Sequence, residues 1–422
     1  TIVEDHKQAG LLFVGTEFGV FFSQNDGDSW HEFTAVPTIA VRDLEIQQRE
    51  NDLIVGTFGR GIYILDDYTP LRTKPADLKK QASTIFPVRD QWLYIEGDLY
   101  DDREKGSSGS DFFTAPNPTY GATFSYYMNE SYDSLKKQRR KAEIKKEKDN
   151  QDTPYPSWDA LRAEDTEDAP VVFAEIKNSD GDVVVRLPAK NSKGFHRLTW
   201  NMRYPAPDQV QLKKPSFVPY WVSDPMGALA TPGDYQVTLY KRQAGELTAL
   251  GDSQTMTLKR LENSPELTSD PAALLAFQQE LSELQRQVNN MGGQLSEVKN
   301  RIKHLKAAHN LTPKATEADY KALSNVVAKI NDLDVMFSGD RTVASRQEAT
   351  SWSIATREGT LYFNVIESQS DPTANHKHSM AIAQKELAGA LQLLKTINAD
   401  LTAHEQRMEK LGAPWTPGRI IQ

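Results

Sequence analysis

The segment SQNDGDSW, residues 23–30, places acidic, amide and hydroxyl side chains close enough together to bind a metal ion or to form a turn. A calcium loop needs acidic ligands at regular alternate positions and a distant glutamate, which this segment lacks. Turn chemistry accounts for all of it, because Asn25 and Asp26 can accept hydrogen bonds from their own backbone and Gly27 supplies a positive φ. We therefore predict a structural turn with Trp30 packed beneath it. The residues assigned to this turn are Ser23, Asn25, Asp26, Gly27, Ser29 and Trp30.

Charged side chains near the amino end are the other candidates for chemistry. Hydrolysis of a glycoside needs two carboxylates facing each other across a cleft, and nothing in the sequence places two acidic residues of this region opposite each other. No G-x-S-x-G elbow, P-loop, dinucleotide-binding fingerprint or H-E-x-x-H motif is present. Ordinary surface charge is one interpretation of these residues, and contact with a ligand is the other, since arginine can hold a carboxylate. The possible ligand contacts are Arg42, Asp43, Arg60 and Asp66.

The histidines and the lack of cysteine limit the metal and cofactor chemistry that we expect. With no cysteine, disulfides, thiolate metal sites and a cysteine nucleophile are excluded. His376 and His378 are two residues apart, whereas a metal-binding pair on a helix is spaced i, i+4 and needs further ligands. His304 and His309 share no helix face, and His404 lies beside an apolar seam, where we expect a packed or edge histidine. We predict no metal and no cofactor, and we assign no catalytic residue.

An internal repeat near the amino end indicates which elements carry these residues. LLFVGTEFGVFFS, residues 11–23, is echoed by DLIVGTFGRGIYIL, residues 52–65, with Val-Gly-Thr beginning at Val14 and at Val55. Each copy has the composition of strand, glycine turn and strand. A period of about 40–45 residues with several strands per unit is typical of a β-propeller blade, and a propeller needs at least ~4 blades. We therefore predict that residues 1–70 are the last blades of a propeller whose other blades lie upstream or on a second chain.

The middle of the chain has the pattern of a β-sandwich. Short apolar segments with strand-like composition alternate with turn signals, and Asp180-Gly181 suits a tight hairpin. We predict an immunoglobulin- or fibronectin-like sandwich of antiparallel strands over residues 71–262. The expected strands lie within 83–95, 120–128, 170–188, 194–205, 232–242 and 253–260. Residues 97–119 are rich in turn-forming residues, and we expect a loop there.

A charged insertion, about residues 131–168, interrupts this sandwich. It contains DSLKKQRRKAEIKKEKDNQ, residues 133–151, in which Glu143 and Glu147 break up the basic charge. An RNA- or membrane-binding helix is one possible interpretation, but interleaved aromatic residues and a wide apolar face are absent. We therefore favour a solvated helical insertion.

The spacing of apolar residues changes to that of helices after Pro265. Ten apolar positions from Leu274 to Leu305 alternate spacings of three and four, which is a heptad seam. Two further stripes fit helices over about 320–333 and 375–411. Short connections favour antiparallel neighbours, so we predict an antiparallel helical bundle over residues 265–413, followed by a tail at 414–422. Dimerisation through the long helix is the alternative explanation of the seam.

Composition narrows the classes of partner. The chain has 422 residues and a net charge of −9, which makes nucleic acid an unlikely partner on bulk electrostatics. No apolar run approaches the ~18 residues that span a bilayer. The first residue is Thr1, so we expect either a processed start or a piece of a longer protein.

Several segments together resemble the C-terminal part of large bacterial BNR-repeat proteins, which carry a sortilin-like propeller and are often labelled glycosyl hydrolases. The segments are residues 11–30, residues 41–67, NPTYGATFSYYM and HRLTWNMRYP. SQNDGDSW matches their Asp box, with Asn25 at the usual aspartate position. The resemblance implies export of the protein to the periplasm, the outer surface or the medium. It also implies that the Asp box is structural, because in sialidases these turns lie away from the catalytic centre, and the sialidase arginine triad, nucleophilic tyrosine and acid aspartate do not map onto this chain.

The function expected from these features is a non-catalytic binding or assembly region of an exported propeller protein, with a carbohydrate or peptide as a possible ligand. One alternative is a sialidase-like glycoside hydrolase whose active site lies mainly on other propeller blades. Another is a subunit that completes a propeller with a second polypeptide.

Overall fold

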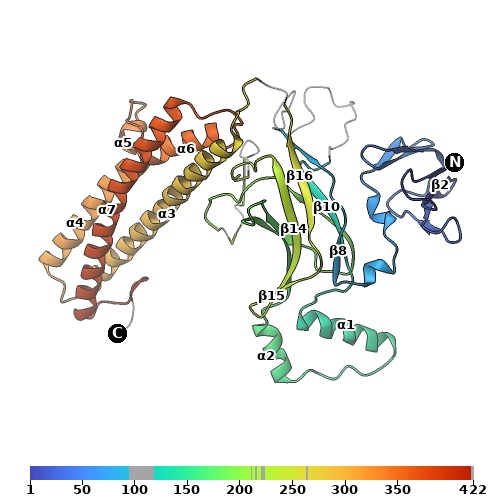
Figure 1. Cartoon of the computed structure of the whole chain (residues 1–422). Coiled ribbons are helices and arrows are strands. Elements are labelled where there is room, and N and C mark those ends of the chain that lie inside the picture. Colours follow the sequence, from blue (N-terminus) through green and yellow to red (C-terminus); the bar gives the residue numbers. More distant parts are fainter. Residues whose placement is uncertain (95–117, 211, 214–215, 220–223, 263–264, 420–422) are drawn as a thin grey trace. The chain divides into compact units, whose positions relative to one another are not determined.

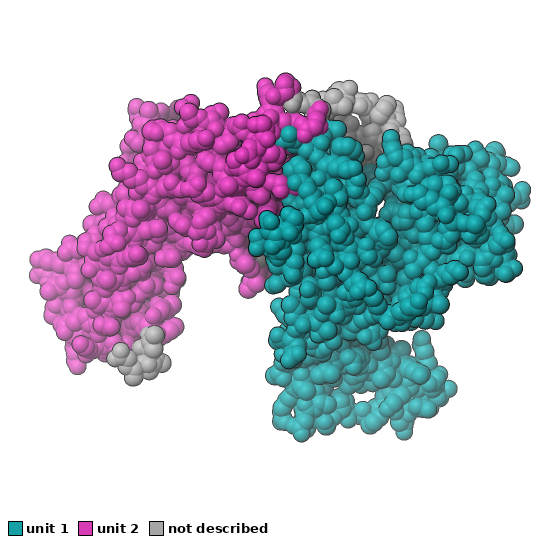
Figure 2. Space-filling model, in the orientation of Figure 1, with its two compact units in different colours: residues 1–94, 115–202, 232–261 teal, residues 95–114, 203–231, 262–422 magenta. Residues whose placement is uncertain are grey.

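The computed structural model describes residues 1–94, 118–210, 212–213, 216–219, 224–262 and 265–419. Most of the loop that we expected at 97–119, and the end of the predicted tail, lie outside these residues. The chain forms two compact units (Figure 2). The first unit is built from residues 1–94, 115–202 and 232–261, and the second from residues 95–114, 203–231 and 262–422. The fold is therefore a mixture of several β-sheets and C-terminal helices, while the three predicted domain boundaries stay a prediction.

Two small antiparallel sheets form the amino-terminal part of the first unit (Figure 1). One is a meander of β1 (Ile2–Glu4), β2 (Leu12–Thr16), β3 (Gly19–Ser23) and β4 (His31–Glu32). The other contains β5 (Val41–Gln47), β6 (Asp52–Thr57) and β7 (Ile62–Leu65). The two sheets share one hydrophobic core, because each is apolar on the face that meets the other. Its buried members are Leu11, Phe13, Val20, Val41, Leu44, Ile46, Leu53, Val55 and Tyr68.

The rest of the first unit is built on two further sheets. Their strands are β8 (Ser83–Ile85), β9 (Gln91–Leu93), β10 (Ala122–Met128), β11 (Val171–Lys177), β12 (Val183–Ala189), β13 (Gly194–Trp200), β14 (Gly233–Gln243), β15 (Glu246–Ala249) and β16 (Gln254–Arg260). One sheet has the order β13-β10-β8, and the other has β12-β11-β14-β16-β9 with β15 paired to β14. The period-2 burial of Tyr235, Val237 and Leu239 confirms the alternation expected for β14. The immunoglobulin- or fibronectin-like fold stays a prediction.

One strand pair differs from the antiparallel arrangement that we predicted. β9 pairs with β16 in parallel, with Gln91 opposite Leu258. A parallel pair needs a long crossover connection, and the residues between Leu93 and Gln254 provide one. The sequence did not reveal this pairing because strand composition does not encode strand direction.

The charged insertion forms two helices, α1 (Leu135–Lys148) and α2 (Trp158–Thr166), neither of which has a buried residue. Arg139 joins them through a two-pronged ion pair with Glu164, at 2.5 and 2.9 Å. Asp133 accepts from Lys141 and lies 2.7 Å from the Lys137 ammonium. Part of the basic charge of α1 is therefore neutralised within the insertion itself.

Helices make up most of the second unit: α3 (Pro271–Asn310), α4 (Glu317–Ser338), α5 (Arg341–Ala344), α6 (Ile354–Val365) and α7 (Ala374–Lys410) (Figure 1). Nine of the ten seam positions of α3 are buried, and the tenth, Phe277, packs partly buried against the same core. Residues of α4, α6 and α7 complete this core, so the seam is covered within one chain. Gly292, inside α3, lies beside the Phe337 ring of α4, where an added Cβ would be 3.4 Å from the ring.

The three long helices α3, α4 and α7 alternate in direction, as predicted for neighbours in an antiparallel bundle, so the first and the third of them run parallel. Gln384 of α7 donates to Glu280 of α3, and Arg301 of α3 donates to Glu405 of α7, so both bonds join residues 104 apart. A constant offset means that α3 and α7 run parallel. α4 runs antiparallel to α7, because Lys329 pairs with Asp400 while Arg407 pairs with Asp319. The short helices α5 and α6 lie between α4 and α7 in the chain, and the sequence pattern did not predict them.

None of the helices within the described ranges combines the length and apolar character needed to cross a membrane.

Candidate functional site

The SQNDGDSW segment folds as a hydrogen-bonded turn between β3 and β4. The Ser23 hydroxyl donates to Asn25 Oδ1 at 2.9 Å and accepts from the Gly27 amide at 2.9 Å. Asn25 Oδ1 also accepts from the Ser29 amide at 3.0 Å. Asp26 and Gly27 both have positive φ, of 59° and 90°. Trp30 lies against Gly27, 3.7 Å from the position of an added Cβ, yet stays partly exposed at the surface. The side chains of Ser23, Asn25 and Ser29 thus hold the turn, whereas within this segment, which the structure describes in full, the Asp26 side chain does not accept the backbone hydrogen bond that we predicted for it. The Gln24 amide donates instead to the carbonyls of Leu71 and Thr73.

The four charged residues predicted as ligand contacts do not form one site. Arg42 and Asp43 lie at the start of β5, and Arg60 lies in the turn between β6 and β7 near the same end of the sheet, since Val41 pairs with Thr57. Asp66 follows β7 at the opposite end, where Leu65 pairs with Leu53. The Arg42 guanidinium covers the ring of Phe58 at 5.0 Å. Among the described residues, no group of three or more histidines and carboxylates is arranged to hold a metal ion.

Residues at equivalent positions of the two repeat copies face the shared core in the first copy and solvent in the second. Copy 1 turns Phe13 and Val20 toward the second sheet, where both are fully buried. Allowing for the one inserted residue, Val20 is equivalent to Ile62, and Phe22 is equivalent to Ile64. Ile62 and Ile64 are 70% and 59% exposed, although Val20 is 0% exposed. We call the outer side of β5–β7, with Ile54, Gly56, Ile62 and Ile64, the open face.

The glycine that occurs in both copies, Gly15 and Gly56, is covered by another sheet only in the first copy. A Cβ added to Gly15 would lie only 2.5 Å from Val41 Cγ1, so the next sheet packs directly on the bare backbone at this position. A Cβ added to Gly56, forty-one residues on, would meet nothing closer than 3.6 Å, and only atoms of Asp43 on its own sheet. A glycine at such a strand position marks a close approach of another backbone or side chain. Gly15 has that neighbour, and Gly56 does not.

A buried ionic cluster fixes the amino-terminal sheets to the chain that follows them. Asp5 accepts two hydrogen bonds from Arg72, at 2.7 and 2.8 Å, and one from the Tyr68 hydroxyl at 2.5 Å. Arg72 also donates to Asn51 at 2.7 Å. Burial alone would raise the pKa of Asp5, but the bonds from Arg72, Tyr68 and the Gln8 amide outweigh it and lower this pKa to about 2. A fully paired buried carboxylate of this kind is structural, and composition gave no sign of it.

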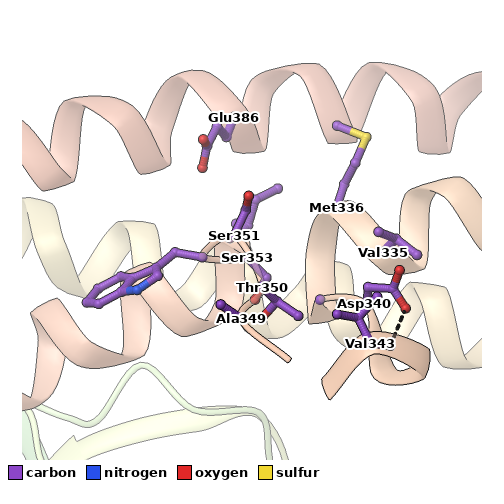
Figure 3. Close-up of a pocket in the computed structure, with 12 residues that line it drawn as sticks. Val335, Met336, Asp340, Val343, Ala349, Thr350, Ser351, Ser353 and Glu386 are labelled. Carbon is purple, nitrogen blue, oxygen red and sulfur yellow. Dashed lines mark hydrogen bonds between the residues drawn. The ribbon is translucent and has the colours of Figure 1, made fainter. Parts of the chain in front are cut away.

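A cavity of about 450 Å³ lies in the helical unit, between the end of α4, α5, the start of α6 and α7 (Figure 3). Val335, Val343 and Ile354 give it apolar walls. Glu386 projects from α7 toward Ser351 and Ser353. Its partner is Arg357, whose Nε lies 3.5 Å from Glu386 Oε2 without a hydrogen bond. Sequence reasoning missed this cavity because the segment between α4 and α6 carries no periodic pattern.

Two histidines that we did not pair in the sequence meet in the core of the helical unit. His309, at the end of α3, and His404, near the end of α7, are 1% and 6% exposed. Their Nε2 atoms are 2.7 Å apart, and their rings stack with centroids 4.9 Å apart. Burial lowers the pKa of both, and for His404 the neighbouring His309 lowers it further. The expectation of a packed histidine is met at His404, but the sequence gave no signal for a partner 95 residues away.

A buried carboxyl group joins α6 to α3. With the Gln285 amide oriented so that its nitrogen faces the carboxylate, Gln285 donates to Glu358 Oε2 at 2.6 Å. Burial, with a smaller contribution from Asp208, raises the pKa of Glu358 to about 7. Because a residue of a different helix satisfies this group, its arrangement is that of an interhelical contact.

No family model matches the chain, and no curated protein matches it. Among solved structures, the chain is similar to dimeric latent PorU from Porphyromonas gingivalis, with 13% identity and a TM-score of 0.19 over 56% of this chain and 15% of that one. It is also similar to the extracellular domain of a hybrid two-component system from B. thetaiotaomicron, with 9% identity and a TM-score of 0.15 over 62% of this chain. The chain spans 15% and 26% of the lengths of these two structures. Likenesses of this size assign neither a fold nor a function.

Proposed function

We propose that this chain is a non-catalytic binding and assembly region of an exported protein, and that its two amino-terminal sheets are neighbouring blades of a β-propeller. In this proposal the middle of the chain is an immunoglobulin- or fibronectin-like sandwich. The export and the family rest on the resemblance of residues 11–30 and 41–67 to BNR-repeat proteins. The assembly role rests on the open face.

The single observation that supports assembly is the exposure of Ile62 and Ile64. Their repeat equivalents are Val20, which is fully buried, and Phe22, which is partly buried against the shared core. An apolar sheet face in water is unfavourable by roughly 25 cal/mol per Å². The repeat itself indicates what covers it: another sheet of the same kind would pack on β5–β7 as β5–β7 packs on β2 and β3. Gly56 leaves room for a side chain of that sheet, as Gly15 does for Val41. The proposed occupant is therefore a further β-sheet of the same propeller.

Cysteine labelling tests this proposal, because the chain has no cysteine of its own. The variant Ile64→Cys is compared with Val20→Cys, at a buried position, and with Arg49→Cys, whose side chain is 81% exposed. In the isolated chain we expect the thiols at positions 64 and 49 to react quickly with a maleimide and the thiol at position 20 to react slowly.

The deciding measurement uses the same variants in the protein isolated from the cells that make it, with all polypeptides that co-purify. We expect the thiol at position 64 to become as slow as the one at position 20, while position 49 stays fast. Equally fast labelling at positions 64 and 49 in that preparation would show that nothing covers the open face, and the assembly proposal would fail.

A further inference from the structure

We infer that His309 and His404 form an acid-sensitive latch, which holds the C-terminal ends of α3 and α7 together at neutral pH and releases them on acidification. The inference is independent of the proposed function. Its basis is the direct bond between the two Nε2 atoms, 2.7 Å apart in a buried site.

The hydrogen bond itself limits how many protons the pair can hold. A neutral imidazole has one N–H and one lone pair, so an Nε2–H of one ring can donate to the bare Nε2 of the other. A single additional proton can be placed on the Nδ1 of the donor ring. A second additional proton would have to occupy the accepting Nε2. Two N–H groups, both on charged rings, would then point at each other, so the doubly protonated pair cannot keep this geometry.

The surroundings of the pair also disfavour charge. His309 Nδ1 is buried without a hydrogen-bond partner, so a proton there would be unsolvated. The His309 ring packs edge-on against Tyr320, with the ring centroids 4.7 Å apart, and the Tyr320 hydroxyl donates to the His309 carbonyl rather than to its ring. Stacked rings, apolar neighbours and an unpaired nitrogen therefore favour the neutral form of both side chains.

The two carboxylates near the histidine pair, Asp319 and Glu405, already form ion pairs with arginines. Asp319 of α4 faces both histidines, and Glu405 of α7 lies next to His404. Arg407 binds Asp319 at 3.1 Å, and Arg301 of α3 binds Glu405 through two bonds at 2.6 and 2.9 Å. The C-terminal ends of two helices would favour a positive charge, but here this attraction competes with burial.

A cavity next to the histidine pair leaves space for the side chains to separate. Its volume is about 240 Å³, and it is lined in part by Lys306, His309, Tyr320 and Leu323. Local opening begins where packing is incomplete and the chain is close to a helix end. The last turn of α3 meets both conditions, so acid-driven opening is expected to begin there, with the release of His404 on α7, before the rest of the core yields.

The direction of the pH effect follows from proton linkage. In the opened state both histidines titrate near their ordinary pKa of 6.5, whereas in the closed state their pKa values lie lower. The latch is therefore fully effective above pH 6.5 and weakens as the pH falls below it. Opening that takes up two protons raises the opening constant by up to about 100-fold per pH unit.

Nuclear magnetic resonance of the whole chain tests the latch directly. At pH 7.5 we expect a scalar coupling between the two Nε2 nuclei across the hydrogen bond, and we expect it to vanish between pH 6.5 and 5. Over the same range, hydrogen exchange at residues 300–309 and 398–410 should accelerate beyond the intrinsic pH dependence of exchange. A coupling that persists at pH 5 would overturn the inference.

Variants separate a titrating latch from a merely packed pair. His309→Asn combined with His404→Gln keeps neutral hydrogen-bonding groups at both positions and should remove the extra acceleration at low pH. His304→Gln, on the exposed side of α3, is the matched control and should leave the acceleration unchanged. If the double variant fails to fold, His404→Gln alone should reduce the steepness to at most about 10-fold per pH unit. An unchanged acceleration in either variant would contradict the latch.

Discussion

The two repeat copies at the amino end have nearly the same strand sequence, but equivalent residues are buried in the first copy and more exposed in the second. In the β1–β4 sheet, Phe13, Gly15 and Val20 lie against the next sheet, whereas in the β5–β7 sheet Ile54, Gly56 and Ile62 form the open face. The residue types do not explain the contrast, since isoleucine is as apolar as valine. The difference lies in what packs on each sheet, so burial here is a property of the stack and not of the single sheet.

This contrast indicates which of the equivalent side chains stabilise the fold of the chain alone. Position 13 contributes to stability through the neighbouring sheet, while positions 62 and 64 can contribute only when another sheet is present. Paired substitutions at equivalent positions therefore measure the neighbour's contribution while the local sequence stays almost constant.

Phe13→Ala has the largest expected effect. Phe13 is fully buried and lies 5.0 Å from the Tyr68 ring, centroid to centroid, so its truncation should lower the free energy of unfolding by about 3–5 kcal/mol. Urea denaturation followed by tryptophan fluorescence measures this loss. Ile54→Ala, at the equivalent position of the second copy, is the control and should cost clearly less. Equal losses would mean that the open face is covered within the chain itself.

Acidification should weaken the link between the sheets and the chain that follows them. The pKa of Asp5 is lowered from 3.8 to about 2, so the stabilisation is present above pH 3.8 and is lost as the pH falls toward 2. One pKa unit is worth about 1.4 kcal/mol, so the loss is about 2 kcal/mol. Unfolding free energies measured between pH 5 and 2 test this. Asp5→Asn should flatten that dependence, and Asp28→Asn, at an exposed turn position, should not.

Gly15→Ala should destabilise the protein by about 1–3 kcal/mol through overpacking, because the added methyl group would lie 2.5 Å from Val41 Cγ1. Gly56→Ala introduces the same atom where the nearest neighbour is 3.6 Å away. That variant should be neutral or slightly stabilising, since alanine restricts the unfolded chain more than glycine does. Thermal unfolding of the two variants side by side checks the difference, and a loss of the same size at Gly56 would contradict the open face.

Periodic patterns made much of this structure predictable. The Val-Gly-Thr repeat predicted strands that the structure contains at β2 and β6, and the three-four spacing from Leu274 to Leu305 predicted the buried seam of α3. Both predictions rest on local chain geometry, which repeats every two residues in strands and about every 3.6 in helices. The turn at residues 23–30 was predictable for a related reason, because its side chains bond to neighbouring backbone.

What the sequence did not predict depends on contacts between distant segments. The short helices α5 and α6 were not predicted, because their few apolar residues, such as Ile354 and Leu361, are too sparse to form a recognisable stripe. His309 and His404 are each unremarkable in their own helices and become a pair only because α3 and α7 run parallel. Arg42 and Asp66 were predicted as ligand contacts, but the sequence did not show that they lie at opposite ends of one sheet. That arrangement depends on strand pairing.

The smallest expected effect is at Ile62. Ile62→Thr replaces an exposed apolar side chain by a smaller β-branched polar one, so the free energy of unfolding of the chain alone should change by less than about 0.5 kcal/mol. Val20→Thr makes a comparable change at the equivalent buried position and should cost about 1–3 kcal/mol, because its hydroxyl loses water without gaining a partner. Denaturant titrations of both variants under one set of conditions give the difference.

A small change in stability on Ile62→Thr has two possible explanations. Measuring the same variant in the protein isolated with its partners distinguishes them. If the open face is a permanent surface, Ile62→Thr stays neutral in every preparation. If a further sheet covers it, the same variant should cost as much as Val20→Thr once that sheet is present, since the hydroxyl is then buried as well. The change in cost between the chain alone and the protein isolated with its partners therefore measures the contribution of the missing neighbour at a single side chain.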